Sequence, residues 1–302
     1  KYKYRHNNIE DCERVLARAC SVAEENGGGV LLITEGVFGM TGALGILDQI
    51  AALKWVYNNI EQFGGDPENI TIFGQSAGAG SVKTLVSSPL TGNMIKKAII
   101  QSGGGVSERA LSPTPAAVNM PNMPVMKSAE ETWKEIMDWG GYDTLEKMRA
   151  ASPEEIFSVV NIYNRINNVR GAGMFAPVVD GYVCKQDFDS AAKDGNLANV
   201  PYMIGFTLND SGNMAPGIAA FCQDRQEKGN KAYAYQFARP LPDDGKHPEV
   251  TQRLKGAFHS SDLWFVFKSL KHCWRPWTEG DWDLTEKMLT AWTNFAKYSD
   301  PQ

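Results

Sequence analysis

The sequence predicts an α/β fold in which helices cover both faces of a mostly parallel sheet. Apolar runs of strand length at residues 30–34, 70–73 and 97–101 are separated by stretches with helical character. The run at 70–73 also leads directly into a glycine-rich turn that opens a helix. Such strand–helix–strand series favour a parallel sheet, which places functional sites at the carboxyl ends of its strands.

The amino-terminal part is predicted to contain two helices and one buried strand. Residues 8–26 carry apolar side chains at helical spacing, and the glycines at 27–29 separate them from the apolar run at 30–34. A second amphipathic helix is predicted at 48–62, ending at Gly64. Its apolar residues recur at steps of three and four: Ile46, Ile50, Leu53, Tyr57 and Ile60.

The remaining elements are predicted from periodicity and from prolines. Four prolines between residues 108 and 124 predict a long loop. Helices are predicted near 128–138, 143–150 and 153–160, and strands at 201–206 and 232–238. A terminal helix is indicated by Thr278 and Asp281 at capping-box spacing and by an apolar stripe formed by Leu284, Met288, Ala291, Trp292 and Phe295.

Composition limits the classes of partner. The chain has 302 residues, of which 43% are hydrophobic, so a single domain over 1–302 with a sizeable core is expected. The net charge of -5 and the scattered basic residues argue against a nucleic-acid partner. No apolar run approaches the roughly 18 residues of a membrane span. We therefore expect a soluble monomer without a membrane partner.

The cysteines and histidines predict neither disulfides nor a metal site. Five cysteines form no C-x-x-C pair, which fits reduced thiols and a cytoplasmic location. Four histidines are widely spaced, without the H-E-x-x-H spacing of a zinc site. We expect no metal and no cofactor.

The most informative motif is the turn that follows the apolar strand at 70–73. Gly74, Ser76 and Gly78 form a G-x-S-x-G pattern between a strand and a helix, which is typical of a nucleophile elbow. A serine in such a turn has a strained backbone, and only glycines two residues to either side allow the neighbouring chains to pass. The helix amino terminus also favours the negative charge of acyl transfer. Ser76 is therefore the predicted nucleophile.

Several further segments accompany this motif. They are GILDQ (45–49), AALKWV (51–56), Asn59-Ile60, FGGDP (63–67), AIIQSG (98–103), FAPVVDG (175–181), GAFHSSDL (256–263), WRPW (274–277) and NFA (294–296). With these segments the chain resembles the carboxylesterase type B (esterase and cholinesterase) family of α/β-hydrolases from about residue 30 to its end. The resemblance implies the α/β-hydrolase fold. It also implies an upstream strand with a His-Gly-Gly-Gly type loop and a longer carboxyl-terminal tail, so we expect a chain shortened at both ends.

The resemblance implies a base and an acid that follow the serine in the order serine, acid, histidine. Asp210, after the strand at 201–206, and His259, in the GAFHSSDL segment, fit that order. His272 is the rival base, and His6 and His247 are weaker candidates. A plain turn aspartate remains an alternative for Asp210, because its glycine lies one place later than in relatives. The fallback acid is Asp180.

Other residues are assigned supporting roles. Ser102 is similar to a family residue near the acid and the histidine, so we expect either support for the triad or a simple turn. The segment around Phe38 is expected to pack structurally. Three aromatic residues either line a pocket or belong to the core: Phe258, Trp264 and Trp274.

The oxyanion hole is the least defined part of the predicted site. One donor should be the backbone amide of Ala77, and relatives supply a second from an upstream glycine-rich loop. The glycines at 27–29, centred on Gly28, follow a predicted helix and fit this loop poorly, so Gly28 is a weak candidate for the second donor.

The leading hypothesis is a serine carboxylic-ester hydrolase that acts on a small-molecule ester through an acyl-enzyme. A cholinesterase-like binding module, or a weakly active remnant with an incomplete oxyanion hole, is the alternative. Retention of both Ser76 and His259 argues against a pure binding module.

Overall fold

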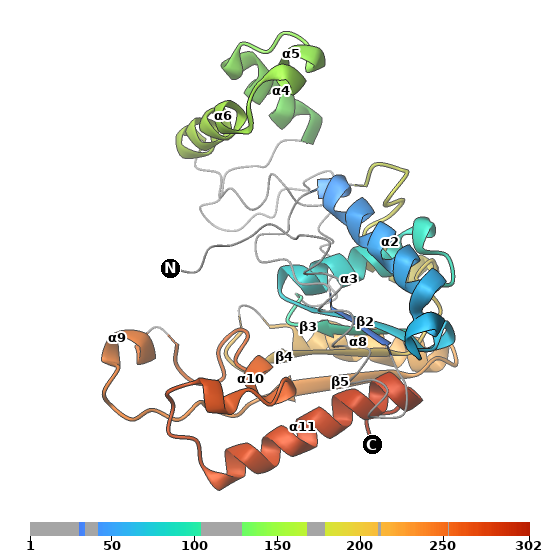
Figure 1. The fold of residues 1–302 in the computed structure, drawn as a ribbon, viewed down its shortest axis with the longest axis vertical. Coiled ribbons are helices and arrows are strands. Elements are labelled where there is room, and N and C mark those ends of the chain that lie inside the picture. Colours follow the sequence, from blue (N-terminus) through green and yellow to red (C-terminus); the bar gives the residue numbers. More distant parts are fainter. Residues whose placement is uncertain (1–29, 34–41, 104–128, 168–178, 211–212, 253) are drawn as a thin grey trace.

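A parallel sheet of five strands in the order β1-β2-β3-β4-β5 lies at the centre of the described part of the computed structural model (Figure 1). Its strands are β1 (Val30–Ile33), β2 (Ile70–Gln75), β3 (Lys97–Gln101), β4 (Tyr202–Thr207) and β5 (Ala232–Phe237). The structure describes residues 30–33, 42–103, 129–167, 179–210, 213–252 and 254–302. None of the helices in these ranges is long and apolar enough to cross a membrane.

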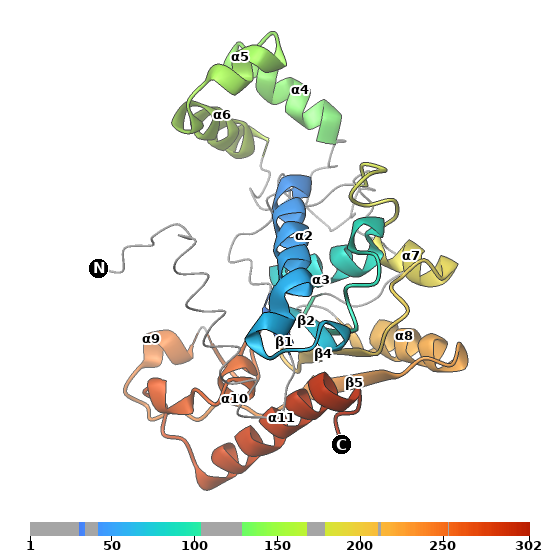
Figure 2. The same ribbon diagram turned by 45° about the vertical axis from the view of Figure 1, so that its right-hand side comes forward.

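One face of the sheet is covered by four helices (Figure 2). They are α2 (Gly42–Asn59), α3 (Ala77–Ser87), α7 (Phe188–Asp194) and α8 (Ala215–Glu227). Alternate strand residues point to this face and pack in one cluster with the helices, including Ile72, Ile100, Ile204, Leu53, Leu85, Ala191 and Phe221. Each fully buried side chain of this size contributes about 1.5–3 kcal/mol.

The opposite face is covered by the long helix α11 (Glu279–Tyr298). Phe73, Ile99 and Met203 from three strands pack against Phe295 of this helix. Tyr235 of β5 and Trp292 also meet edge to face, with ring centroids 4.8 Å apart. Burial on both faces explains the continuous apolar strands, and it confirms the predicted α/β class.

The predicted strands agree with the observed ones within two residues at each end, whereas some helices differ. Helix α2 begins at Gly42 instead of residue 48, because Ile46 is buried and tertiary packing outweighs the poor helix propensity of glycine. Its end agrees with the prediction, since a 3-10 turn (Ile60–Phe63) closes at Gly64, whose φ is 79°.

Helices α7 and α8 were not predicted from the sequence. The buried side of α8 consists of Ile218, Phe221, Cys222 and Arg225, so a charged residue interrupts its apolar stripe. Arg225 is tolerated there because its guanidinium binds Asn199 Oδ1 at 3.1 Å and lies 5.3 Å from the centre of the Tyr202 ring.

Three helices lie together at one end of the molecule, away from the sheet (Figures 1 and 2). They are α4 (Ala129–Gly140), α5 (Leu145–Ala150) and α6 (Pro153–Ile166), close to the predicted ranges. They share a small cluster of their own, formed by Ile136, Val160 and Tyr163. The expectation of a single domain stays a prediction.

The other described elements are short. They are the helices α9 (Pro248–Thr251) and α10 (Leu263–Val266) and the 3-10 turns Pro67–Asn69, Pro89–Thr91 and Leu270–His272. The predicted helix at 8–26, the glycines at 27–29, Phe38 and the loop at 108–124 lie outside the described residues.

A lysine on α3 links this helix to the turn after β3. Lys83 Nζ donates to the Gly103 carbonyl at 2.9 Å and lies 5.1 Å from the centre of the Phe188 ring. Burial lowers the pKa of Lys83 from 10.5 to about 8, although the nearby Asp189 carboxylate partly opposes that shift.

This lysine should make stability depend on pH in the alkaline range. Between about pH 8 and 10.5 the unfolded chain binds more protons than the folded one, so the free energy of unfolding should rise with pH. Urea denaturation at several pH values should show this rise, and Lys83→Met should flatten it. The same substitution at the exposed Lys54 of α2 is the control. An equal slope in Lys83→Met and the unchanged chain would contradict the expectation.

Candidate active site

The turn between β2 and α3 holds Ser76 in a strained conformation. Its backbone has φ 57° and ψ -120°, a region that residues other than glycine rarely adopt. A Cβ atom on Gly74 would lie 2.3 Å from the carbonyl carbon and oxygen of Gly78, so the two glycine backbones must touch. The Ser76 amide donates to the Gln101 carbonyl at 2.9 Å, which ties the turn to β3. These constraints place the hydroxyl at the end of the sheet.

A continuous chain of hydrogen bonds joins three of the predicted site residues. Ser76 Oγ lies 2.8 Å from His259 Nε2, and His259 Nδ1 lies 2.7 Å from Asp210 Oδ1. The side chain of Asp210 is 2% exposed and that of His259 is 42% exposed. An ionised carboxylate only accepts hydrogen bonds, so Nδ1 carries the proton and Nε2 is left to accept from the serine.

The turn that carries Asp210 is attached to the loop that carries His259. The Asn209 amide donates to the Ala257 carbonyl at 2.9 Å, and the Ala257 amide donates to Asn209 Oδ1 at 2.9 Å. Gly256 has φ 68°, and a Cβ there would lie 2.2 Å from Asn209 Oδ1. These two bonds fix the spacing of the acid and the base. No local sequence pattern indicates Asn209 or its partner Ala257, which lies 48 positions away.

A buried polar layer lies beneath these residues, on the α11 side of the sheet. Tyr235 Oη donates to Asp262 Oδ2 at 3.3 Å, and both residues contact the fully buried region around Gln101. Burial raises the pKa of Asp262, and the nearby Asp210 carboxylate raises it further. Asp262 therefore keeps its proton to higher pH than an exposed aspartate. In the sequence, Asp262 stands out only as a member of the GAFHSSDL segment around His259.

Two other predicted site residues, Asp180 and Ser102, do not take part in the hydrogen-bonded chain of Ser76, His259 and Asp210. Asp180 Oδ1 accepts from the backbone amides of Tyr182, Val183 and Cys184 at 2.8–3.0 Å. Despite some desolvation, these bonds hold the pKa of Asp180 below its usual value. Asp180 thus caps its own turn. Ser102, with φ 52°, is buried at the end of β3, but its hydroxyl makes no hydrogen bond within the described ranges.

The rival histidines lie elsewhere. His272 ends the 3-10 turn Leu270–His272 and is exposed. The His247 ring contacts the Trp274 ring at a tilt, with ring centroids 4.1 Å apart. His6 lies outside the described residues.

The three candidate aromatic residues of the predicted pocket separate into core and surface. Phe258 and Trp264 contact each other edge to face at 6.0 Å and pack on a buried cluster that includes Phe237 and Phe265. Trp274 is 40% exposed. For Phe258 and Trp264 the structure supports the core interpretation.

The oxyanion hole can be described in part. Ala77 begins α3, and the first amides of a helix have no acceptor within it. Its amide therefore remains available beside Ser76. Gly28, the candidate for the second donor, lies outside the described residues.

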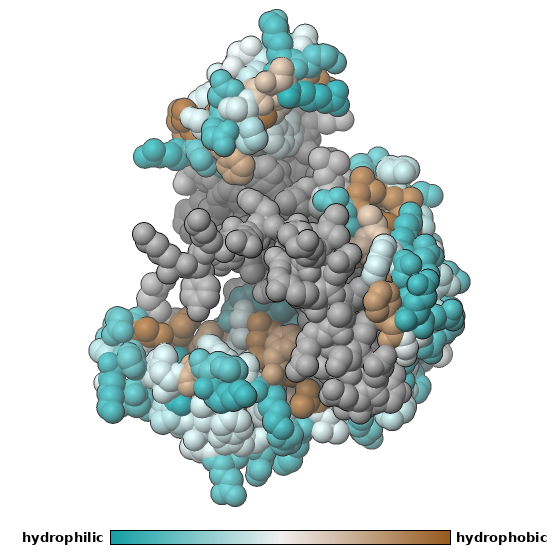
Figure 3. Space-filling model, in the orientation of Figure 1, coloured by the Kyte–Doolittle hydropathy of each residue, from teal (hydrophilic) through white to brown (hydrophobic). Residues whose placement is uncertain are grey.

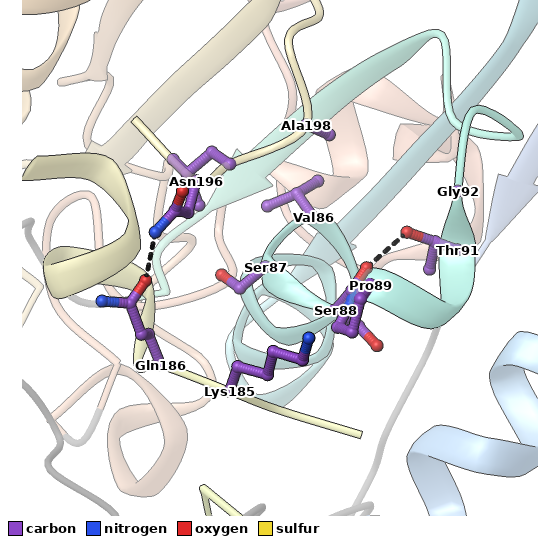
Figure 4. Close-up of a pocket in the computed structure, with 11 residues that line it drawn as sticks. Val86, Ser87, Ser88, Pro89, Thr91, Gly92, Lys185, Gln186, Asn196 and Ala198 are labelled. Atoms are coloured by element: carbon purple, nitrogen blue, oxygen red, sulfur yellow. Dashed lines mark hydrogen bonds between the residues drawn. The ribbon is translucent and has the colours of Figure 1, made fainter. Parts of the chain in front are cut away.

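The described ranges contain no group of three His, Cys, Asp or Glu side chains placed to hold a metal ion. A groove of about 640 Å³ with a mixed polar and apolar lining lies at the far end of α3, where Ser87, Lys185, Asn196 and Leu197 are among the lining residues (Figure 4). Its first lining residue on α3, Val86, lies ten positions after Ser76, which is about 15 Å along the helix at 1.5 Å per residue. The groove is thus remote from the hydrogen-bonded chain.

The glycine contact in the turn predicts a strong asymmetry between two substitutions. Gly74→Ala should lower the free energy of unfolding by about 3 kcal/mol or more, because its methyl group meets backbone atoms that cannot move aside. Gly80→Ala, on α3, meets nothing within 4 Å and should be neutral or stabilising by up to about 1 kcal/mol. Urea denaturation of both variants measures this, and similar values would contradict the close approach.

The Asn209 bridge predicts a second stability difference. Asn209→Ala leaves the Ala257 amide without its acceptor, which should lower the free energy of unfolding by about 1–3 kcal/mol. Asn230→Ala is the control, because the side-chain amide of Asn230 makes only a 3.4 Å hydrogen bond to the Lys228 carbonyl at an exposed position. Thermal or urea unfolding that ranks Asn230→Ala as the more damaging change would be inconsistent with the bridge.

Comparison with known proteins gives consistent similarities. The chain is 33% identical over 192 residues to liver carboxylesterase 1F of Rattus norvegicus, covering 60% of this chain and 32% of the relative. It is 30% identical over 245 residues to para-nitrobenzyl esterase of Bacillus subtilis (strain 168), covering 77% and 43%. A solved carboxylesterase of Geobacillus stearothermophilus matches with a TM-score of 0.64 and 26% identity, covering 86% of this chain and 60% of that one.

These similarities extend over most of the chain but only part of each relative. The chain spans about a third to just over half of the curated relatives it matches. The sequence profile described as the carboxylesterase family matches residues 32–220 and 213–302. The fold is that of the α/β-hydrolases, as the esterase structures show. The chain therefore belongs to the carboxylesterase family.

Proposed function

We propose that this chain is a serine carboxylic-ester hydrolase that works through an acyl-enzyme, with Ser76 as nucleophile, His259 as base and Asp210 as the orienting acid. The observation that carries the proposal is the unbroken hydrogen-bonded chain from Ser76 Oγ through both imidazole nitrogens to Asp210 Oδ1, at 2.8 and 2.7 Å. A serine hydroxyl needs such a base to act as a nucleophile at neutral pH.

The geometry supports a definite sequence of proton movements. His259 Nε2 takes the Ser76 proton as Oγ attacks the ester carbonyl, and then delivers it to the departing alcohol oxygen. Water repeats the cycle and releases the acid. Asp210 Oδ1 stabilises the imidazolium formed between these steps and keeps the ring oriented. Because Asp210 is buried, this interaction is less screened by solvent than a surface pair.

The backbone supports the same chemistry. The carbonyl oxygen gains negative charge during attack, and the Ala77 amide at the start of α3 is available to donate to it. Ser76, with its positive φ, presents its hydroxyl to His259 Nε2 at 2.8 Å. A second donor from Gly28 remains a proposal that the described residues do not test.

The substrate class follows from the site and from the family. Hydrophobic residues gather on the surface beside α10 (Figure 3). Phe267, just after α10, is 46% exposed and contacts Phe73, three residues before Ser76, at 6.0 Å. An apolar surface beside the nucleophile suits esters with apolar groups. We propose small carboxylic esters as substrates, because the relatives are named as carboxylesterases and esterases.

A fluorophosphonate probe tests this proposal, because it attaches to an activated serine without requiring the natural substrate. We expect attachment at Ser76, none in Ser76→Ala, and labelling at least about a thousandfold slower in His259→Ala. His272→Ala is the control histidine variant and should label as the unchanged chain does. Peptide mass spectrometry identifies the modified serine, and hydrolysis of a short-chain nitrophenyl ester gives the rates.

Each alternative has its own outcome. Attachment at another serine would move the nucleophile away from Ser76. Equal losses in the two histidine variants would place the base elsewhere. A folded chain that takes no probe would support the alternative of a binding module or an inactive remnant.

A further inference from the structure

Gln75, the last residue of β2, touches the nitrogen of His259 that reacts with Ser76. Its Nε2 atom lies 3.2 Å from His259 Nε2, the nitrogen that also accepts from Ser76 Oγ at 2.8 Å. The Gln75 backbone is fixed, because it is aligned with Gln101 in the parallel ladder of β2 and β3. Its side chain is half-buried. Two donors therefore converge on one imidazole nitrogen.

This arrangement is satisfactory only while the imidazole is neutral. Neutral Nε2 offers a single lone pair, which the serine hydroxyl and the Gln75 amide share. When the serine proton moves to Nε2, that nitrogen becomes a donor and faces the N–H of Gln75. Two donors then oppose each other beside a positive charge. A carboxamide resolves this conflict by turning about its terminal bond, because its other atom, Oε1, is an acceptor.

Nothing described around Gln75 prevents this rotation. The contact with His259 is the one hydrogen bond found for its side chain among the described residues. Terminal torsions of glutamine are broad and roughly twofold, so both orientations of the carboxamide are accessible.

We propose that the Gln75 carboxamide reverses its orientation when the Ser76 proton moves to His259 Nε2, and this inference rests on the function proposed above. In the resting site its N–H donates to His259 Nε2. After Ser76 has given its proton to Nε2, Oε1 accepts from the new N–H and stabilises the imidazolium until the proton passes to the departing alcohol. The amide then turns back, and no net change occurs in Gln75. The residue thus acts on the reacting nitrogen, on the side opposite to Asp210.

Two substitutions separate this role from simple packing. Gln75→Met keeps a similar length and volume but neither donates nor accepts a proton. Gln75→Glu only accepts, so it preserves the interaction with the imidazolium and loses the resting donation. The matched control is Gln49→Met, because half-buried Gln49 also donates one bond of 3.2 Å, to Ser81 Oγ of α3, without touching His259.

Fluorophosphonate labelling at pH 8 measures the effect on the charged state. Hydrogen bonds to charged groups correspond to about a tenfold to hundredfold change in rate, so Gln75→Met should label slower by about that factor. Gln75→Glu should label faster than Gln75→Met, and Gln49→Met should match the unchanged chain. Labelling of Gln75→Met at the original rate would overturn the proposal. So would a Glu variant that is as slow as the Met variant, because a packing role gives no rescue by an acceptor.

A measurement on the resting protein does not depend on turnover. In chain labelled with ¹⁵N-histidine, the four imidazoles give few signals, and His259→Ala identifies the one of interest. The Nε2 shift should move in Gln75→Met and stay unchanged in Gln49→Met, and an unchanged shift in both would overturn the resting contact. If the unchanged chain takes no probe, the proposed function fails, while this shift still decides whether Gln75 binds the imidazole.

Discussion

The close approach of Gly74 and Gly78 is the constraint on which the candidate site depends. Because these two backbones touch, β2 can turn into α3 within a few residues. That turn leaves Ser76 at φ 57°, with its hydroxyl beyond the carboxyl end of the sheet. The cost of this backbone strain, about 1–3 kcal/mol, is offset by the buried strands and helix on both sides. Nearly every residue of β2 and most of α3 lie in the core.

The parallel sheet then determines which residues meet the serine. Strands β2, β3 and β4 end at one edge, so the segments after them lie side by side although they are far apart in the chain. Asp210 follows β4 directly, but a long connecting segment separates His259 from the end of β5. Asn209 closes that distance by exchanging two hydrogen bonds with Ala257. The spacing of Asp210 and His259 therefore depends on the two hydrogen bonds between Asn209 and Ala257, and not on the side chains of Asp210 and His259 alone.

Polar residues below this edge shape the environment of the proposed triad. Asp262 and Tyr235 are buried together on the α11 side, and Asp262 holds its proton more tightly because water is excluded. Gln75 borders the imidazole from β2. The imidazole of His259 thus lies within hydrogen-bond distance of the Asp210 carboxyl group at Nδ1 and of the Gln75 carboxamide at Nε2.

The sequence by itself determined the fold class, the strands and Ser76 as the candidate nucleophile. Each of these depends on local patterns, such as apolar runs or the spacing of glycines around one serine. It also indicated Asp210 and His259, through chain order and family resemblance. It missed α7, α8 and the first turns of α2. Buried Arg225 interrupts the apolar period of α8, glycines interrupt that of α2, and α7 has only seven residues. Only the tertiary structure decided that Asp210, and not Asp180, faces His259, and that Asn209 and Gln75 contact the same loop. Those contacts join residues 48 to 184 positions apart, and no local pattern records which strand ends a parallel sheet brings together.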